Sequence, residues 1–149
     1  MEKKTNIISS FNLLEVYDSI ISLQEKNVYL ISKDLLKDLD SSKRYIYCLA
    51  KDLSNTYGFM ILKDSIDVLE LEYILVDKDY KNNNIGSMLI NEGVKIAMEK
   101  DIHKIMLEVR KSNESAISFY LKNGFNKISE RKDYYKDPLE DGLIFEKIV

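Results

Sequence analysis

The stretch between Ile66 and Val109 switches from strand to helix periodicity and back, and this feature constrains the fold most. Apolar residues along Ile66–Val76 predict a long strand, and apolar residues at helical spacing over Ile85–Glu99 predict a helix. Ile105, Leu107 and Val109 alternate with Met106, Glu108 and Arg110, a pattern that predicts another strand. A helix set between two strands indicates a sheet that carries helices on its surface.

The rest of the chain adds elements on both sides of this segment. Short apolar runs predict strands at Ile7–Ile8, Tyr45–Ala50, Tyr57–Leu62, Phe125–Glu130 and Leu143–Val149. Helical spacing predicts a first helix over Asn12–Glu25, a second that Ser32 caps, and a fourth that Ser112-Asn113 cap and Asn123-Gly124 end. Strands separated by single helices, with hairpins at both ends, indicate an α+β fold with a mixed sheet.

The composition favours one folded domain over residues 1–149. Hydrophobic residues make up 45% of the chain and charged residues 32%, which are the proportions of a globular protein. The sequence has a single proline and no Gly/Ser-rich linker, so we expect no domain boundary. No run approaches the roughly 18 apolar residues that a membrane span needs, so we expect no membrane partner.

Charge and cysteine content disfavour several classes of function. The net charge of −3 disfavours direct binding of nucleic acid, which usually requires a basic excess. Cys48 is the only cysteine, so no intrachain disulfide is possible and a reducing cytoplasm fits best. Its place within a predicted strand favours a small buried apolar residue over a nucleophile. With His103 as the single histidine, we expect no metal site.

The first candidate site is the polar turn Asn82–Asn84, which opens a helix directly after a strand. The first N–H groups of a helix have no acceptor within the helix, so they can bind a pyrophosphate. Asn84 can adopt the left-handed conformation that glycine usually supplies, and Gly86 would let the backbone approach the phosphate. Taken alone, the motif fits an ordinary turn better, because asparagine and glycine are common in turns.

The second candidate site combines Glu108 with Tyr120. Glu108 alternates with Leu107 and Val109 and therefore lies on the opposite face of its strand. Tyr120 lies about two turns into the following helix, so both side chains could converge on one cleft. For an arbitrary strand and helix, an exposed glutamate and a core tyrosine would be the simpler interpretation.

Together these motifs resemble the GNAT acetyltransferases. The GNAT phosphate loop reads Arg/Gln-x-x-Gly-x-Gly/Ala, and the corresponding residues are Lys81-Asn82-Asn83-Asn84-Ile85-Gly86. The more specific match is Leu107-Glu108-Val109-Arg110-x-Ser112-Asn113-x-x-Ala116-Ile117-x-x-Tyr120-x-x-x-Gly124-Phe125, followed by Arg131-x-x-Tyr134-Tyr135 and Glu140-Asp141. The resemblance is dense from about Leu69 onward and is closest to the bacterial ribosomal-protein-alanine N-acetyltransferases.

The resemblance implies a fold, a cosubstrate and roles for residues. The fold would be a mixed, mostly antiparallel sheet of about seven strands flanked by four helices, and the cosubstrate acetyl-CoA. Glu108 would be the general base and Tyr120 the general acid of a direct acetyl transfer. The coenzyme-binding residues would be Ile74, Leu75, Val76, Lys81, Asn82, Asn83, Asn84, Ile85, Gly86, Ser87 and Asn113.

The resemblance also implies an acceptor, the α-amine of an N-terminal alanine in a ribosomal protein. Glu140 and Asp141 would then help to attract the basic residues common in ribosomal proteins. Members of this family usually carry a Pro-Trp pair before the second helix, in the region that lines the acceptor site, but this chain has Tyr29-Leu30-Ile31-Ser32 there. Other acceptors therefore stay open: a small-molecule amine, a polyamine or a lysine side chain. A non-catalytic protein that binds coenzyme A is a further alternative.

Overall fold

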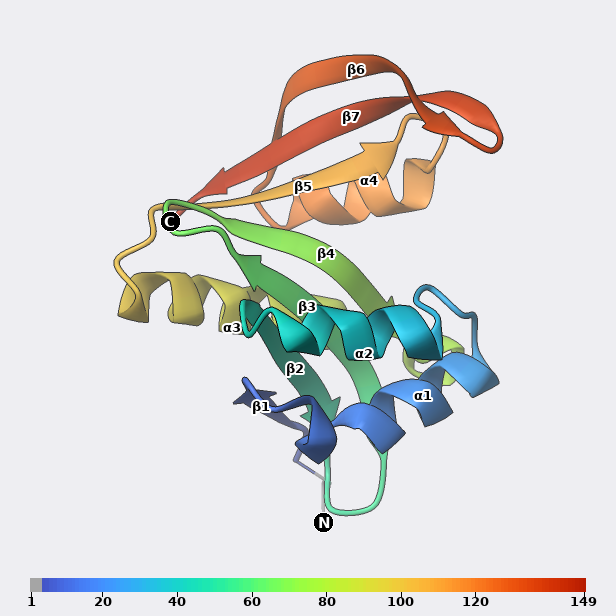
Figure 1. The fold of residues 1–149 in the computed structure, drawn as a ribbon, viewed down its shortest axis with the longest axis vertical. Coiled ribbons are helices and arrows are strands. Elements are labelled where there is room, and N and C mark those ends of the chain that lie inside the picture. The colour runs from blue at the N-terminus through green and yellow to red at the C-terminus, as the bar shows by residue number, and fades with distance from the viewer. Residues whose placement is uncertain (1–3) are drawn as a thin grey trace.

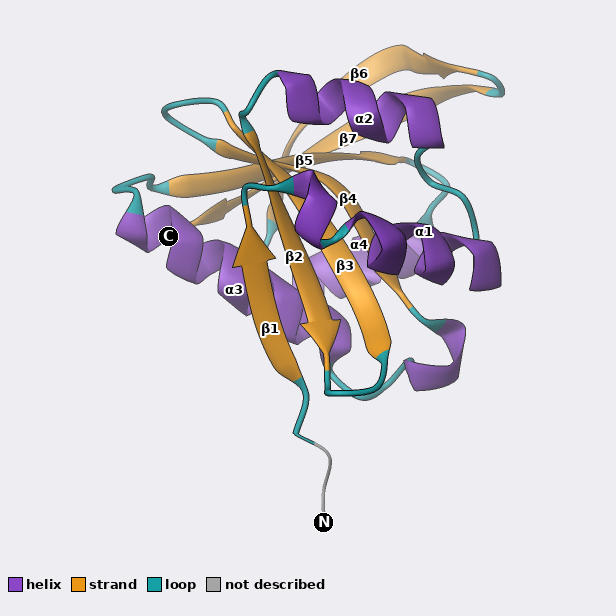
Figure 2. Ribbon diagram, turned by 60° about the horizontal axis from the view of Figure 1, so that its bottom comes forward, coloured by secondary structure: helices purple, strands orange, loops and turns teal. Residues whose placement is uncertain are grey.

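The computed structural model describes residues 4–149, which form a seven-stranded sheet with helices on both faces (Figures 1 and 2). The strands are β1 (Asn6–Ser10), β2 (Tyr45–Lys51), β3 (Thr56–Asp64), β4 (Leu69–Val76), β5 (Lys104–Arg110), β6 (Asn126–Lys136) and β7 (Leu139–Ile148). The helices are α1 (Tyr17–Lys26), α2 (Lys33–Ser41), α3 (Ile85–Glu99) and α4 (Glu114–Lys122), with the 3₁₀ turns η1 (Leu13–Glu15) and η2 (Lys78–Tyr80). The fold is the mixed, mostly antiparallel sheet that the sequence predicts.

The sheet has the strand order β1-β2-β3-β4-β5-β7-β6, and only β4 and β5 run parallel. This parallel pair is short: Leu69 pairs with Ile105 and Glu70 pairs with Met106. Beyond these two pairs the strands diverge, and β5, β7 and β6 rise away from β4 (Figure 1). From Leu71 onward, the edge of β4 that faces β5 therefore has no strand partner among the described residues.

Two apolar layers cover the sheet. On one face, α3 and α4 bury residues such as Leu89 and Tyr120 against strand residues such as Leu107. On the other face, α1 and α2 bury Ile20 and Leu36 against the middle of β2 and β3. The alternation of strand side chains thus divides the sheet residues between the two cores.

Local signals located most helix ends correctly. The helix α3 spans the residues that its periodicity predicts, Ser32 caps α2 through the N–H of Leu35, and Asn113 caps α4. The bounds predicted for the first helix were wrong at its start, because Asn12 caps only the turn η1. Val16, with φ of −123°, separates η1 from α1, which begins at Tyr17.

The strand predicted to begin at Ile66 begins at Leu69 instead. The N–H of Ile66 donates to the carboxylate of Asp64 at 3.0 Å, and the N–H of Ser65 donates to the carbonyl of Val68 at 3.0 Å. Ile66 has a φ of +72°, so these residues form the turn of a hairpin. Apolar side chains alone could not reveal this turn.

The last two strands are longer than predicted. The hairpin β6–β7 extends beyond Glu130 on one side and begins before Leu143 on the other, and it projects from the molecule (Figure 1). Most side chains of β6 are exposed on both faces, so the burial alternation that marks a strand is missing there.

Candidate active site

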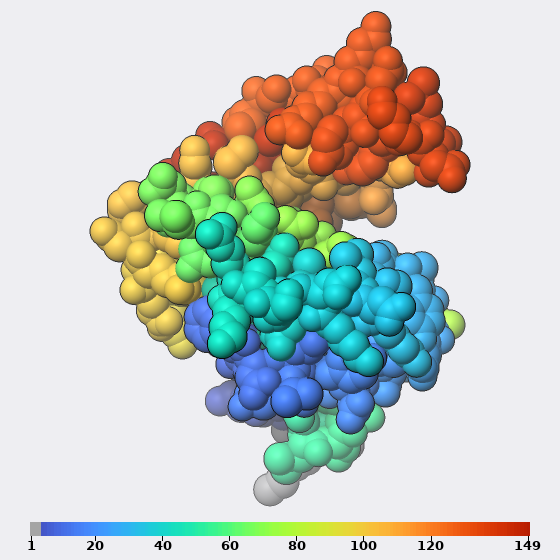
Figure 3. Space-filling model, viewed as in Figure 1, coloured from blue at the N-terminus to red at the C-terminus, as the bar shows by residue number. Residues whose placement is uncertain are grey.

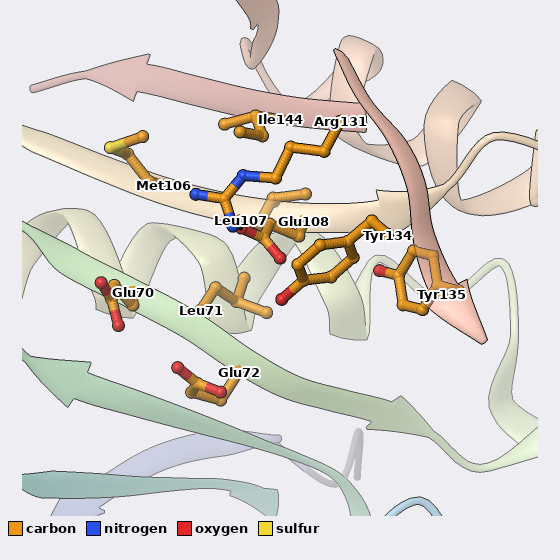
Figure 4. A pocket seen from close by; sticks show the side chains of 10 residues that line it. All are labelled: Glu70, Leu71, Glu72, Met106, Leu107, Glu108, Arg131, Tyr134, Tyr135 and Ile144. Atoms are coloured by element: carbon orange, nitrogen blue, oxygen red, sulfur yellow. Dashed lines mark ion pairs between the residues drawn. The ribbon is translucent and has the colours of Figure 1, made fainter. Parts of the chain in front are cut away.

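The divergence of β4 and β5 opens a cavity of about 400 Å³. The space-filling view shows the molecule notched between the β6–β7 hairpin and the α1–α2 region (Figure 3). The residues that line the cavity are Glu70, Leu71, Glu72, Met106, Leu107, Glu108, Arg131, Tyr134, Tyr135 and Ile144 (Figure 4). They come from β4, β5, β6 and β7, so the cavity exists only once the sheet has formed.

A β-bulge in β4 sets the floor of this cavity. Ile61 of β3 pairs with Tyr73 and Leu62 pairs with Leu71, which leaves Glu72 as the extra residue. Leu71 packs in the α3–α4 core, and Tyr73 packs against the α1–α2 core. The bulge thus leaves Glu72 lining the cavity, between a residue of one core and a residue of the other.

Glu108 lies on the strand face that its alternation predicts. Its neighbours Leu107 and Val109 are buried in the α3–α4 core, and the Glu108 side chain reaches the cavity with 30% of its surface exposed. Its Oε1 lies 3.2 Å from the guanidinium Nη1 of Arg131. A hydrogen bond to Glu108 is also the main cause that raises the pKa of Tyr134.

Tyr120 approaches β5 from the other face of the sheet. It is 7% exposed, and its ring packs edge-on against Phe125 at a centroid distance of 5.6 Å. Burial, with a smaller effect of Tyr135, raises the pKa of Tyr120 to about 12. Tyr135 lines the cavity with Glu108, and the charge of Glu108 contributes to raising the pKa of Tyr135, after burial. The structure does not place Glu108 and Tyr120 on one cavity wall.

The start of α3 has the geometry of an anion site. Asn82 and Asn84 adopt the left-handed conformation, with φ of +70° and +59°. The side chain of Asn84 makes no capping hydrogen bond, and the carbonyl of Asn84 accepts from the N–H of Met88 at 2.9 Å. The N–H groups of Ile85, Gly86 and Ser87 therefore have no acceptor within the helix. Lys81–Asn84 are exposed, so a ligand can reach this helix start.

Comparisons with known proteins agree with this geometry. The model of the acetyltransferase (GNAT) family matches residues 13–125. This chain belongs to the GNAT family. A relative from Bacillus subtilis is 32% identical over 108 residues, which cover 71% of this chain and 70% of the relative. The ribosomal protein bS18-alanine N-acetyltransferase of Escherichia coli is 30% identical over 107 residues, which cover 70% of this chain and 72% of the relative.

Solved structures show the same fold. The crystal structure of the ribosomal-protein-S18-alanine N-acetyltransferase from Escherichia coli matches with a TM-score of 0.81 at 24% identity, covering 98% of this chain and 94% of that chain. A GNAT acetyltransferase from Elizabethkingia anophelis with acetyl-CoA bound matches with a TM-score of 0.76 at 20% identity over the full length of both chains. Together with the family model and the relatives of 30–32% identity, this identifies the chain as an acetyl-CoA-dependent N-acetyltransferase.

Several residues of this GNAT enzyme fit acetyl-CoA. The exposed loop and the free N–H groups at the start of α3 suit the pyrophosphate. Ile74, Leu75 and Val76 pair with β3 on one side only, so their other backbone edge is available to the amide groups of the pantetheine arm. The oxygen of the Asn113 side chain already caps α4 by accepting from the N–H of Ala116 at 3.2 Å, which leaves its amide nitrogen for a ligand.

Gly86 has a second role that the sequence did not reveal. A Cβ atom on Gly86 would lie 2.8 Å from the ring atoms Cε2 and Cζ of Phe119. The glycine is therefore required for close packing of α3 against α4, whatever its contact with a phosphate.

Glu140 and Asp141 also have structural contacts in the β6–β7 hairpin. Glu140 accepts a hydrogen bond from the N–H of Ser112 and pairs with Arg110 at 3.2 Å. Asp141 accepts from the N–H of Asp133 at 2.8 Å. These hydrogen bonds and the ion pair link the β6–β7 hairpin to itself and to the end of β5. The attraction of a basic substrate by the two carboxylates stays a prediction.

Hydrogen bonds to a buried side chain hold the segment Tyr29–Ser32, which stands in place of the Pro-Trp pair. The buried side chain of Gln24 accepts from the N–H groups of Leu30 and Ile31 at 2.9 Å and donates to the carbonyl of Ile31 at 3.1 Å. These bonds fix the loop between α1 and α2, and Tyr29 and Leu30 stay exposed on it.

Sequence reasoning missed Glu70 and Glu72, which line the cavity beside Glu108. Neither belongs to a recognised motif, and the bulge that aims Glu72 into the cavity has no local sequence signal. Among residues 4–149, the structure shows no group of three or more side chains that could hold a metal ion. No helix in the described part of the chain is long and apolar enough to cross a membrane.

Proposed function

We propose that this enzyme acetylates the N-terminal α-amine of a ribosomal protein, with alanine as the first residue. The observation that carries the proposal is the opening between β4 and β5, where Glu108 faces a cavity next to the free edge of β4. The name of the Escherichia coli relative, a ribosomal protein bS18-alanine N-acetyltransferase, supports this acceptor. Such a substrate would place the enzyme in the cytoplasm.

In the proposed reaction, Glu108 removes a proton from the acceptor through a water molecule. An α-ammonium group has a pKa of about 7.7–8.0, so this step is not demanding near neutral pH. The free amine then attacks the thioester carbonyl directly, without a covalent enzyme intermediate. A backbone N–H of Ile74–Val76, on the unpaired edge of β4, stabilises the oxyanion.

Tyr120 assists the departure of the thiolate. Because burial raises its pKa to about 12, Tyr120 is protonated at neutral pH, as a donor must be. An ordinary thiol has a pKa of about 8.5, so we expect a hydrogen bond to the departing sulfur in preference to complete proton transfer. Holding both reactants in one opening supplies much of the remaining rate acceleration.

A panel of acceptors tests the proposal. The purified enzyme is incubated with acetyl-CoA and peptides that begin with Ala, Ser or Met, with peptides whose only free amine is a lysine, and with small amines, and products are identified by mass spectrometry. We expect acetylation of α-amines with Ala preferred. Acetylation of lysine side chains or small amines without α-amines would refute the proposed acceptor.

Glu108→Gln tests the proposed base. The variant should lower kcat by about 10²–10⁴-fold while coenzyme affinity stays close to wild type, because Glu108 removes a proton and does not hold the phosphates. The loss should shrink as pH rises through about 8, where the free amine becomes abundant. Wild-type turnover by this variant at pH 7 would exclude Glu108 as the base.

A further inference from the structure

The three glutamates of the cavity differ in their ion-pair partners. Glu108 pairs with Arg131 at 3.2 Å, and Glu70 lies 4.0 Å from Lys63. Glu72 has no basic partner within 4.0 Å in the part of the chain that the structure describes. Among the described residues, Glu72 is therefore the one of the three glutamates without an ion pair, and Lys63 acts on it only from more than 4.0 Å.

Glu72 and Glu108 flank the opening from its two sides. The parallel register pairs Leu69 with Ile105 and Glu70 with Met106, and two further residues along each strand lead to Glu72 and Glu108. The strands have parted at this point, so the two side chains face the opening from β4 and from β5 (Figure 4). An amine that reaches Glu108 through the opening passes beside Glu72.

The electrostatics of Glu72 also favour an incoming cation. Its pKa is raised, first by desolvation in the cavity and then by the negative charge of Glu70, while the positive charge of Lys63 opposes the rise. A hydrogen bond with Glu70 and the charge of Glu108 raise the pKa of Glu72 further. Glu72 still reaches solvent at the cavity mouth, so a ligand can approach it. A positive charge placed here would relieve the repulsion among the carboxylates.

We propose that Glu72 binds the acceptor amine in its ammonium form and so selects positively charged acceptors, while Glu108 takes the proton. Because Arg131 already compensates Glu108, an arriving ammonium group gains most from Glu72. This inference rests on the proposed entry of the amine through the opening. It does not depend on whether the amine belongs to an alanine.

Steady-state kinetics of Glu72→Gln at saturating acetyl-CoA, with the best acceptor of the panel, test this role. The KM for the acceptor should rise by about 10- to 100-fold, as for loss of a hydrogen bond to a charged group, and kcat should stay close to wild type. Glu99→Gln is the matched control, because it removes the same charge at the exposed end of α3, away from the cavity. Its KM should equal that of the wild type.

The pH dependence separates binding of a cation from removal of a proton. For an α-amine, the ratio of KM between Glu72→Gln and wild type should shrink above about pH 8, where the ammonium form declines. An unchanged KM in Glu72→Gln would overturn the proposal. A fall of kcat at constant KM would also overturn it, because Glu72 would then be the base. If the panel finds a lysine or small-amine acceptor, the proposed N-terminal substrate fails, and the same comparison with that amine still decides the role of Glu72.

Discussion

At the scale of single residues, Gly86 shows how packing and ligand binding meet at one position. In Gly86→Ala the new Cβ would overlap the ring of Phe119, so we expect a loss of about 1–3 kcal/mol in the free energy of unfolding. Denaturant titration measures this loss. Combining Gly86→Ala with Phe119→Leu should restore part of the stability, because the smaller side chain makes room. Equal losses in the single and double variants would contradict this packing account.

At the scale of an element, the start of α3 can be tested through the opposite effects of one charge. Ser87 is the third residue of α3, where a carboxylate is favourable to the helix but repels a bound pyrophosphate. Ser87→Asp should therefore lower coenzyme affinity by at least about tenfold, from like-charge repulsion, without lowering stability. Calorimetric titration with coenzyme A and thermal unfolding measure the two effects.

Ser87→Asn is the control for this element, since it has nearly the same shape as Ser87→Asp without the charge. It should bind the coenzyme more tightly than Ser87→Asp. Equal affinities of the two variants would mean that the pyrophosphate lies away from the start of α3.

At the scale of the whole molecule, we expect the ionised Glu72 in the cavity to lower the free energy of unfolding. The pKa of Glu72 in the native state is raised above the unfolded value of about 4.3. Ionising Glu72 is therefore harder in the native state, and its contribution to stability falls as pH rises through the native pKa. Glu72→Gln should unfold at a higher urea concentration than wild type at pH 7.5, and the difference should vanish as pH falls toward about 4.3. A less stable Glu72→Gln at pH 7.5 would refute this expectation.

The sequence alone determined the features that depend on local interactions. The helical spacing gave the bounds of α3, the side chains of Ser32 and Asn113 marked the starts of α2 and α4, and the alternation around Glu108 indicated its exposed face. Each of these depends on residues a few positions apart, so the chain encodes them without its tertiary contacts. The family motifs could be recognised in the sequence for the same reason, because they lie on continuous segments.

The tertiary structure decided how distant segments share the site. The bulge that aims Glu72 into the cavity arises from the pairing of β3 with β4, and the opening beside it arises where β4 and β5 part. The approach of Tyr120 from the face opposite Glu108 follows from the packing of α4 against the sheet. None of these has a local pattern, because each depends on the relative placement of elements that the sequence separates.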